Sequence, residues 1–226
     1  MHSTAVEDYL KAIWTLQQDE TPVSTSRIAE RLGLTSAAVT AMVKRLAEQK
    51  LLHHEPYYGV RLTGAGELSA LRIIRRHRVL ELFLAEVLGY DWDRVHEEAE
   101  RLEHAASDEL IERLARLLGE PERDPHGAAI PSSSGEIKSA AYPTLAEIEP
   151  GESVSVVEVR TEEPEQLRYL GTLGLYPGAH VEVRATAPFD GTVTLVVDGA
   201  DNVISHPLAL QILVAPGEAS LSGAGN

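Results

Sequence analysis

The segment VHEEAERLEH, residues 95–104, repeats metal-type side chains at helical spacing. Each residue of an α-helix turns about 100° from the last, so His96, Glu100, Glu103 and His104 fall within an arc of roughly 100°. A different arc of the same helix is apolar. Imidazole nitrogens and carboxylate oxygens on one face are the donors that a divalent transition metal needs. The alternative is an ordinary solvated face rich in glutamate.

A second pair of such side chains lies in the helix expected over residues 67–88. His77 and Glu81 are spaced i, i+4 and therefore share a face. One His–Glu pair is weak evidence, because such pairs are usually surface contacts, but two constellations on consecutive helices are stronger. Hard donors with histidine favour Mn²⁺ or Fe²⁺, and Zn²⁺ or Co²⁺ could also enter.

The N-terminal part of the chain has the pattern of a DNA-binding module. Helices are expected over residues 4–18, from a Ser24 or Thr25 cap through Leu32, and from a Thr35 or Ser36 cap to about Gln49. A glycine turn between the last two makes a helix-turn-helix, and LLHHEPYYGVRLT then predicts a two-stranded wing. We expect residues 1–64 to bind DNA; the alternative is a small helical domain without that role.

Charge is distributed unevenly between this module and the rest of the chain. The net charge is −15, yet residues 1–64 contain seven Lys/Arg and seven Asp/Glu. Residues 23–50 contain five basic and two acidic side chains, so a locally cationic module precedes an acidic body. The acidic body should repel DNA and keep unspecific binding weak.

Length and composition limit the class of protein. At 226 residues the chain is long enough for two or three domains. It has no cysteine, so a disulfide framework and a thiolate metal site are excluded. The N-terminus lacks the pattern of a secretory signal, and no segment approaches the roughly 18 apolar residues of a membrane span. We expect a cytoplasmic protein without a membrane partner.

Further helices are expected after the module, one over residues 67–88, one from Asp91, and one capped by Ser107. Their leucines exceed what three helices can bury among themselves, and a homodimer interface is the natural place for this surplus. The residues in question are Leu80, Leu84, Val87, Leu110, Ile111, Leu114, Leu117 and Leu118.

The C-terminal third changes from helical to strand patterns. Residues 121–144 are rich in Pro, Gly, Ser and Ala and predict a linker. The segments SVSVVEVR, AHVEVRAT, TVTLVVDG and ALQILVAP then predict strands of a small β-barrel. The tail SLSGAGN, residues 220–226, is expected to be disordered.

The whole chain resembles the diphtheria toxin repressor family of metal-dependent transcriptional regulators, and within it the manganese-responsive branch. The motifs that carry the resemblance are EDYLKAIW, RIAERLGLTSAAVTAMVKRL, YYGVRLTGAG, RRHRVLELFL, VHEEAERLEHAASDEL, DPHGAAIP and LGLYPGAHVEV. The resemblance implies a mainly α fold with a small β domain. It implies a winged helix-turn-helix domain over residues 1–64, a helical metal-binding and dimerisation domain with linker over 65–140, and an SH3-like, FeoA-like barrel over 141–226.

The resemblance also implies two metal positions. The primary site would take Asp8, Glu100, Glu103 and His104. The ancillary site would take His77, Glu81 and His96, and the barrel would add Glu163 and Gln166, aligned through the EEPEQ segment. Mn²⁺ is the expected metal, Fe²⁺ is possible, and Zn²⁺, Co²⁺ or Cd²⁺ could substitute in vitro.

Departures from the family pattern refine this expectation. The iron-responsive branch has sulfur ligands where this chain has Asp8 and Glu100, and oxygen favours the harder Mn²⁺. The manganese branch has a further glutamate one turn after Asp8, where this chain has Lys11, a cation that repels metal. We therefore expect a hybrid with the three-domain ancillary site rather than the paired-manganese arrangement.

For DNA, the resemblance places the third helix in the major groove. Thr35, Ser36, Ala37 and Thr40 would meet base edges, where small polar and methyl groups suit thymine contacts and shape reading. Phosphate contacts would set position rather than sequence. The residues expected to make them are Arg27, Lys44 and Arg45.

The expected function is a metal-activated regulator, not an enzyme, that represses metal-uptake genes. A metal between Asp8 and residues 100–104 would tie each DNA-binding module to the dimer core and set the spacing of the two recognition helices for operator half-sites. Two alternatives stay open. One is a di-metal carboxylate enzyme on a helical bundle, and the other is a winged-helix regulator that senses a non-metal ligand.

Overall fold

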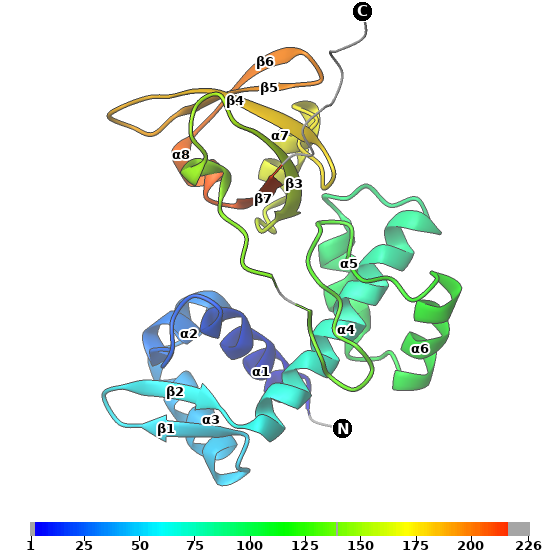
Figure 1. Cartoon of the computed structure of the whole chain (residues 1–226). Helices are drawn as coiled ribbons and strands as arrows, with labels where there is room; N and C mark the ends of the chain where they lie inside the picture. The colour runs from blue at the N-terminus through cyan, green and yellow to red at the C-terminus, as the bar shows by residue number, and fades with distance from the viewer. Residues whose placement is uncertain (1–2, 139, 217–226) are drawn as a thin grey trace, which may run out of the picture. The chain divides into compact units, whose positions relative to one another are not determined.

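The N-terminal module consists of three helices and a wing in the computed structural model, which describes residues 3–138 and 140–216 (Figure 1). Its helices are α1 (Thr4–Gln17), α2 (Thr25–Leu32) and α3 (Ser36–Glu48). The Ser24 hydroxyl accepts a hydrogen bond from the Arg27 amide, and the Thr35 hydroxyl accepts one from the Ala38 amide. These caps satisfy amides that have no partner inside the helix, so the predicted starts of α2 and α3 are confirmed.

The wing follows α3 directly. Strand β1 (Leu52–Glu55) pairs antiparallel with β2 (Gly59–Leu62), and a bridge between Val23 and Val60 ties the wing to the segment before α2. Gly59 has a φ of +130°, and a Cβ there would lie 2.5 Å from the Val23 carbonyl oxygen. Only glycine allows the backbones to approach so closely.

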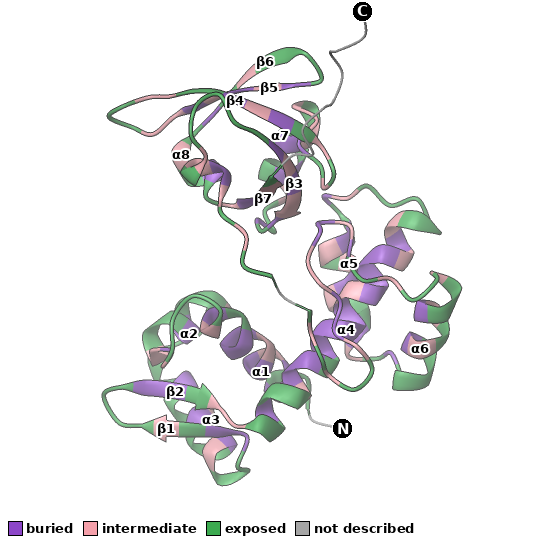
Figure 2. Ribbon diagram, viewed as in Figure 1, coloured by how far each residue is buried: buried purple, intermediate pink, exposed green. Residues whose placement is uncertain are grey.

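Helix α4 (Gly64–Glu86) shares its hydrophobic core with the winged helix. Buried residues of α1, α3 and the start of α4 form one cluster, which includes Leu10, Ile13, Leu46, Ala70 and Ile74 (Figure 2). The helix starts at Gly64 rather than at the expected residue 67, because the Thr63 hydroxyl accepts from the Gly66 amide. This packing brings α1 against the helix that carries His77.

Two shorter helices complete the helical part of the chain. Helix α5 (Val95–Glu103) starts later than the expected Asp91, because a turn in which the Arg94 amide donates to the Asp91 carbonyl precedes it. Helix α6 (Asp108–Leu117) has the expected Ser107 cap, whose hydroxyl accepts from the Leu110 amide.

The C-terminal domain is built on a five-stranded antiparallel sheet in the order β6-β5-β4-β3-β7 (Figure 1). The strands share one core, which includes Val156, Val183, Leu195 and Ile212, and β5 buries every second residue on it. The elements are η1 (Leu145–Glu147), β3 (Ser153–Val159), α7 (Pro164–Thr172), β4 (His180–Thr186), β5 (Val193–Val197), β6 (Ala200–Ile204), α8 (His206–Ala209) and β7 (Ile212–Pro216).

The predicted fold class is therefore confirmed, with a few differences. The sequence analysis did not predict β6, α7 or α8. Leu80, Leu84 and Ile111, expected at a dimer interface, are instead buried within the chain itself. The tail 220–226 lies outside the described residues. No helix in the described part of the chain has the length and apolarity needed to cross a membrane.

Part of the segment 121–144, which the sequence predicts to be a linker, is buried. The segment contains no helix or strand among its described residues, but Asp124, His126, Ile130 and Pro131 are buried. Gly127 has a φ of +91°, and a Cβ there would lie 2.0 Å from the Val157 carbonyl oxygen. Residues 124–131 are thus largely buried, and Gly127 serves close packing, whereas the described residues between 132 and 144 are half-buried or exposed.

Contacts divide the chain into two compact units. The first comprises residues up to 80 together with 100–120 and 130–137. The second comprises 81–99, 121–129 and residues from 138 onward. Each unit has its own group of candidate ligands.

Candidate metal centres and nucleic-acid interface

Three predicted ligands gather in the first unit. Helix α1 supplies Asp8, the last residue of α5 is Glu103, and His104 follows it. His104 Nε2 lies 3.1 Å from Asp8 Oδ1 and 3.5 Å from Glu103 Oε1. One donor atom from each residue lies within 4.8 Å of the others. This is a compact nitrogen and oxygen donor set without sulfur, which suits a hard divalent cation.

A buried glutamate orients the imidazole of this group. Glu7 Oε2 lies 2.8 Å from His104 Nδ1, and Glu7 Oε1 lies 3.4 Å from Arg76 Nη1. When Nδ1 donates its proton to Glu7, the Nε2 lone pair is left on the side of Asp8 and Glu103. Metal-binding histidines in proteins are commonly held by a carboxylate in this way. The sequence analysis missed Glu7, for which the available signal was an acid among the buried positions of α1.

The pKa values of Asp8 and Glu103 are shifted in opposite directions. Burial raises the pKa of Asp8, the charge of His104 opposes that rise, and the charges of Glu100 and Glu103 add to it. Burial would also raise the pKa of Glu103, but a hydrogen bond from His77 and the charge of Lys11 lower it overall. A cation beside Asp8 would relieve the repulsion that favours its protonated form.

Lys11 lies among the other candidate ligands of the first unit. Its ammonium donates to both carboxylate oxygens of Glu103, at 2.9 and 3.2 Å, and to Glu100 Oε1. Lys11 Nζ also lies 3.0 Å from His77 Nδ1, and His77 Nδ1 lies 2.6 Å from Glu103 Oε2. The predicted ligands Glu100 and His77 are therefore both in contact with a lysine.

A separate group of donors lies in the second unit. Glu81, Asp124 and His126 are all buried and offer donor atoms within 4.8 Å of one another. His126 Nε2 lies 2.8 Å from the Trp92 carbonyl oxygen, whereas Nδ1 lies 3.9 Å from Glu81 Oε1. When Nε2 donates to the Trp92 carbonyl, the Nδ1 lone pair is left for a cation on the Glu81 side.

Asp124 and His126 were missed because they belong to the segment predicted as a linker. An aspartate and a histidine two residues apart, beside proline and glycine, were the available signal. One Asp124 oxygen accepts from the amides of His126 and Ala128, at 2.9 and 3.0 Å, and this fixes the loop.

The remaining predicted ligands of the ancillary site stand as follows. His96 Nδ1 lies 3.3 Å from Glu81 Oε1, so the structure brings these two together. His96 Nε2 lies 3.9 Å from Glu162 Oε2, one residue before the predicted Glu163. Gln166 Oε1 accepts from the Thr161 hydroxyl at 2.7 Å, and Glu163 is the residue just before α7. The roles of Glu163 and Gln166 stay predictions.

The predicted DNA-contacting residues lie on an exposed surface. Arg27 is on α2, Thr35 directly precedes α3, and the others are on α3. The Thr35 hydroxyl is used as a helix cap, the Thr40 hydroxyl donates to the Ser36 carbonyl, and Arg27 lies 3.6 Å from Glu20. The exposed members are Arg27, Thr35, Ser36, Ala37, Thr40, Lys44 and Arg45.

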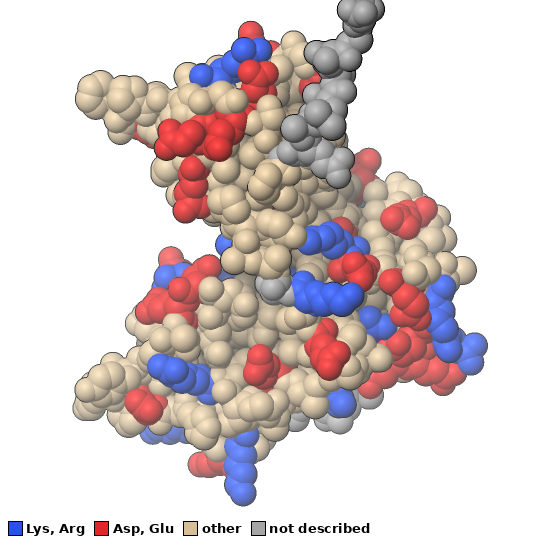
Figure 3. Space-filling model, in the orientation of Figure 1, with Lys and Arg blue, Asp and Glu red and all other residues tan. Residues whose placement is uncertain are grey.

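The wing adds two aromatic side chains to this surface. Tyr57 and Tyr58 lie in the turn between β1 and β2, and both are fully or largely exposed. Figure 3 shows basic and acidic side chains interspersed over the winged-helix module, whereas acidic side chains gather on part of the C-terminal domain. The exposed helix and wing together form a surface of the kind that enters DNA grooves.

Comparisons with known proteins agree with this layout. Residues 1–60 match the family described as iron dependent repressor, N-terminal DNA binding domain. Residues 63–132 match iron dependent repressor, metal binding and dimerisation domain, and residues 144–216 match the FeoA domain.

Individual relatives match over nearly the whole chain. The iron-dependent repressor IdeR of Mycobacterium tuberculosis is 32% identical over 224 residues, which cover 92% of this chain and 95% of that protein. A solved structure of a manganese-dependent transcriptional repressor in complex with manganese has a TM-score of 0.88 at 39% identity, over 93% of this chain and 99% of that chain. The structure of ScaR with bound Zn²⁺ has a TM-score of 0.81 at 34% identity, over 93% and 99% of the two chains.

Proposed function

Because the chain belongs to the diphtheria toxin repressor family of iron- and manganese-dependent repressors, we propose that it is a Mn²⁺-activated DNA-binding repressor that acts as a homodimer in the cytoplasm. The relatives are repressors, and they give no support to a di-metal enzyme. Repression of metal-uptake genes is the regulation that we propose.

The observation that carries the proposal is the arrangement around His104. Its Nδ1 contacts buried Glu7, and its Nε2 lies beside Asp8 and Glu103. These residues fit a divalent cation, because their donors are one nitrogen and carboxylate oxygens that converge on one another. A bound cation supplies positive charge and Lewis acidity there, and Asp8, Glu103 and His104 would hold it.

Asp8 couples metal binding to the DNA-binding module. It lies on α1, which packs in the same core as α3, whereas Glu103 is the last residue of α5 and His104 follows it. Ligands from both places hold α1 at a fixed position relative to α5 and α6. In a two-fold dimer this would fix the separation of the two α3 helices, which must match half-sites roughly 34 Å apart. Metal that binds the competent arrangement more tightly raises its population.

We propose a second cation position in the second unit, formed by Glu81, Asp124 and His126. Two observations support it. All three side chains are buried, and their donor atoms lie within 4.8 Å of one another. The contact of His126 Nε2 with the Trp92 carbonyl also orients Nδ1 toward Glu81. His96, with Glu81 and Glu162 near its two nitrogens, is placed to contribute.

The test uses a duplex selected from a random-sequence library by the Mn²⁺-loaded wild-type protein. Fluorescence anisotropy should show tight binding with Mn²⁺ and weak binding with a chelator. Asp8→Ala and Glu103→Ala should lose the metal response, whereas Asp19→Ala, which changes an exposed aspartate near the end of α1, should keep it. An unaltered metal response in both ligand variants would refute the proposal. If Mn²⁺ does not change the DNA affinity of the wild type, the result would favour a regulator that senses a non-metal ligand.

A further inference from the structure

Lys11 is a half-buried lysine inside a cluster of potential metal donors. Its side chain is 18% exposed, and Glu103 beside it is fully buried. Lys11 lies one helical turn after Asp8 on α1, so both side chains reach the same end of α5. The described contacts of its ammonium are Glu100, both oxygens of Glu103, and the His77 imidazole.

The partners of this ammonium are those of a metal ion. Two carboxylates and an imidazole are the donors that Mn²⁺ or Fe²⁺ takes in proteins. An ammonium offers three N–H donors and one positive charge, and so can satisfy the same oxygens. A buried carboxylate such as Glu103 is costly without an opposite charge, and Lys11 supplies that charge without any metal.

The place that Lys11 occupies excludes a second cation. A divalent ion bound by Glu100, Glu103 and His77 would lie within a few ångströms of Nζ, where like charges repel. In the Asp8–Glu103–His104 group, Glu103 accepts from Lys11, whereas His104 contacts Glu7 through Nδ1 and faces Asp8 through Nε2. Asp8 and His104 can therefore still hold one ion.

We propose that Lys11 is a built-in cation that takes the position of a second metal ion in this centre, so that the Asp8–Glu103–His104 group binds a single divalent ion in each chain. The inference rests on the proposed function for the presence of that single ion. The contacts of Lys11 also join α1 to α4 and α5. Because these contacts need no metal ion, they would hold this part of the regulator together before metal binds.

The first test counts Mn²⁺ ions in the full-length dimer. Lys11→Glu places an acid at this position and should bind one more Mn²⁺ per chain than the wild type, measured by equilibrium dialysis with elemental analysis. Its Mn²⁺ electron paramagnetic resonance spectrum should show exchange coupling between neighbouring ions, and the wild-type spectrum should not. Lys138→Glu is the matched control, because it makes the same charge change at an exposed lysine that pairs with Glu122.

A second test does not depend on metal. Lys11→Gln keeps a polar side chain but removes the charge that Glu103 and Glu100 need. In chelator, its melting temperature should fall below that of the wild type by several degrees, while Lys138→Gln should leave it unchanged.

The outcomes separate this proposal from the proposed function. Equal Mn²⁺ counts in wild type and Lys11→Glu, or an unchanged melting temperature in Lys11→Gln, would overturn the role of Lys11 alone. A wild type that binds no Mn²⁺ at Asp8 would overturn both. An extra, exchange-coupled ion in Lys11→Glu together with a destabilised Lys11→Gln would support the inference.

Discussion

Glu7 Oε2 lies 2.8 Å from His104 Nδ1, although these two residues are 97 positions apart in the sequence. Glu7 is 4% exposed and also contacts Arg76. The burial and the Arg76 contact hold the Glu7 carboxylate in place, and this carboxylate in turn orients the His104 imidazole. The metal-facing nitrogen of His104 therefore depends on a residue that contributes no ligand to the group.

The first prediction concerns this orienting contact. Glu7→Gln should weaken Mn²⁺ binding about 10–100-fold, as loss of an outer partner of a metal-binding histidine typically does. Isothermal titration calorimetry on the full-length protein measures the change. Glu20→Gln changes an exposed acid just beyond α1 and should bind as the wild type does. Equal affinities for Glu7→Gln and wild type would show that His104 needs no such support.

The second prediction concerns the ion pair that joins α4 to α6. Arg75 is buried, donates to both oxygens of Glu112 at 2.8 and 2.9 Å, and donates to the Pro131 carbonyl at 2.9 Å. Glu112→Gln should destabilise the metal-free protein by about 1 kcal/mol at pH 7, because buried Arg75 loses a charged partner. Chemical denaturation with far-ultraviolet circular dichroism measures the loss.

The same pair predicts a pH dependence. The hydrogen bond from Arg75 lowers the pKa of Glu112 below its usual 4.5. A depressed carboxyl pKa gives stability that is present above the unfolded value and is lost as pH falls through the folded value. The wild type should therefore lose more stability than Glu112→Gln between pH 5 and pH 3. Parallel acid titrations of the two proteins would contradict this.

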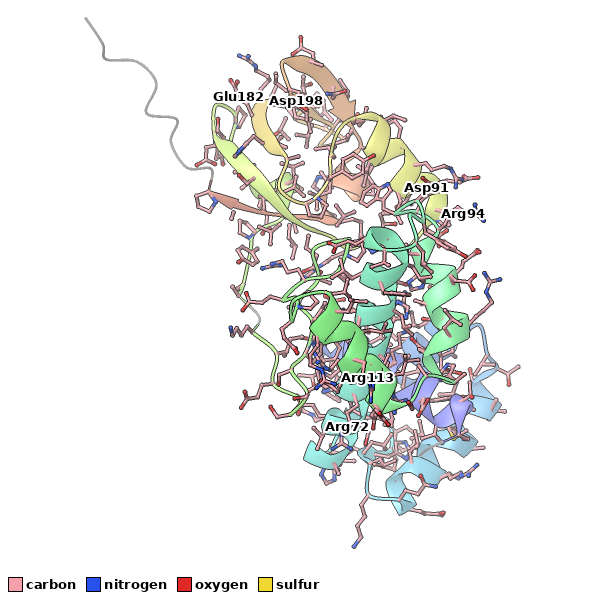
Figure 4. The ribbon with its side chains drawn as sticks, turned by 90° about the vertical axis from the view of Figure 1, so that its right-hand side faces the viewer. Arg72, Asp91, Arg94, Arg113, Glu182 and Asp198 are labelled. Atoms are coloured by element: carbon pink, nitrogen blue, oxygen red, sulfur yellow. The ribbon has the colours of Figure 1, made fainter. Side chains whose placement is uncertain are left out.

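The third prediction concerns DNA. Lys44 and Arg45 are exposed on α3, and the resemblance assigns them to phosphates. Lys44→Ala or Arg45→Ala should weaken binding to all sequences alike and should reduce the slope of log K against log salt by about 1. Arg184→Ala is the control, since Arg184 is an exposed arginine on β4 that pairs with Glu182, labelled in Figure 4. A change in sequence preference with an unchanged salt slope would instead indicate base contacts.

The fourth prediction concerns the dimer. Leu110 and Leu117 on α6 are 45% and 66% exposed, and Arg113 of the same helix is also exposed to solvent (Figure 4). Exposed leucines at i and i+7 form a stripe that suits a partner helix. Leu110→Glu with Leu117→Glu should yield monomers in sedimentation velocity. Leu210→Glu, at an equally exposed leucine of the C-terminal domain, should remain dimeric.

The sequence predicted those parts of the fold that depend on residues close together in the chain. The caps at Ser24, Thr35 and Ser107 were correct because a cap involves only a few neighbouring residues. Strand β6 was missed because its sequence, ADNVI, is polar and its burial pattern leaves one end exposed. Helix α7 was missed because it begins at Pro164 in a charged segment, where helical periodicity is weak.

In the candidate sites too, the sequence predicted the residues that follow a local pattern or a family motif and missed those in a loop. Asp8, Glu103 and His104 were found because α5 repeats its donors at helical spacing and because the resemblance added Asp8. Asp124 and His126 were not found, since a loop has no periodicity and only tertiary packing buries it. The sequence did show that Lys11 stands where an acid was expected, but only the fold shows which groups its ammonium contacts.

The absence of sulfur from both donor groups has a consequence for conditions of oxidative stress. Peroxide acts on thiolates and thioethers, converting them to sulfenic acids, disulfides or sulfoxides. The chain has no cysteine, and its two methionines are not among the donors. Peroxide in the cell would therefore not oxidise the carboxylate and imidazole donors of this regulator through thiol chemistry. Its response to manganese would continue under conditions that oxidise sulfur-based sensors.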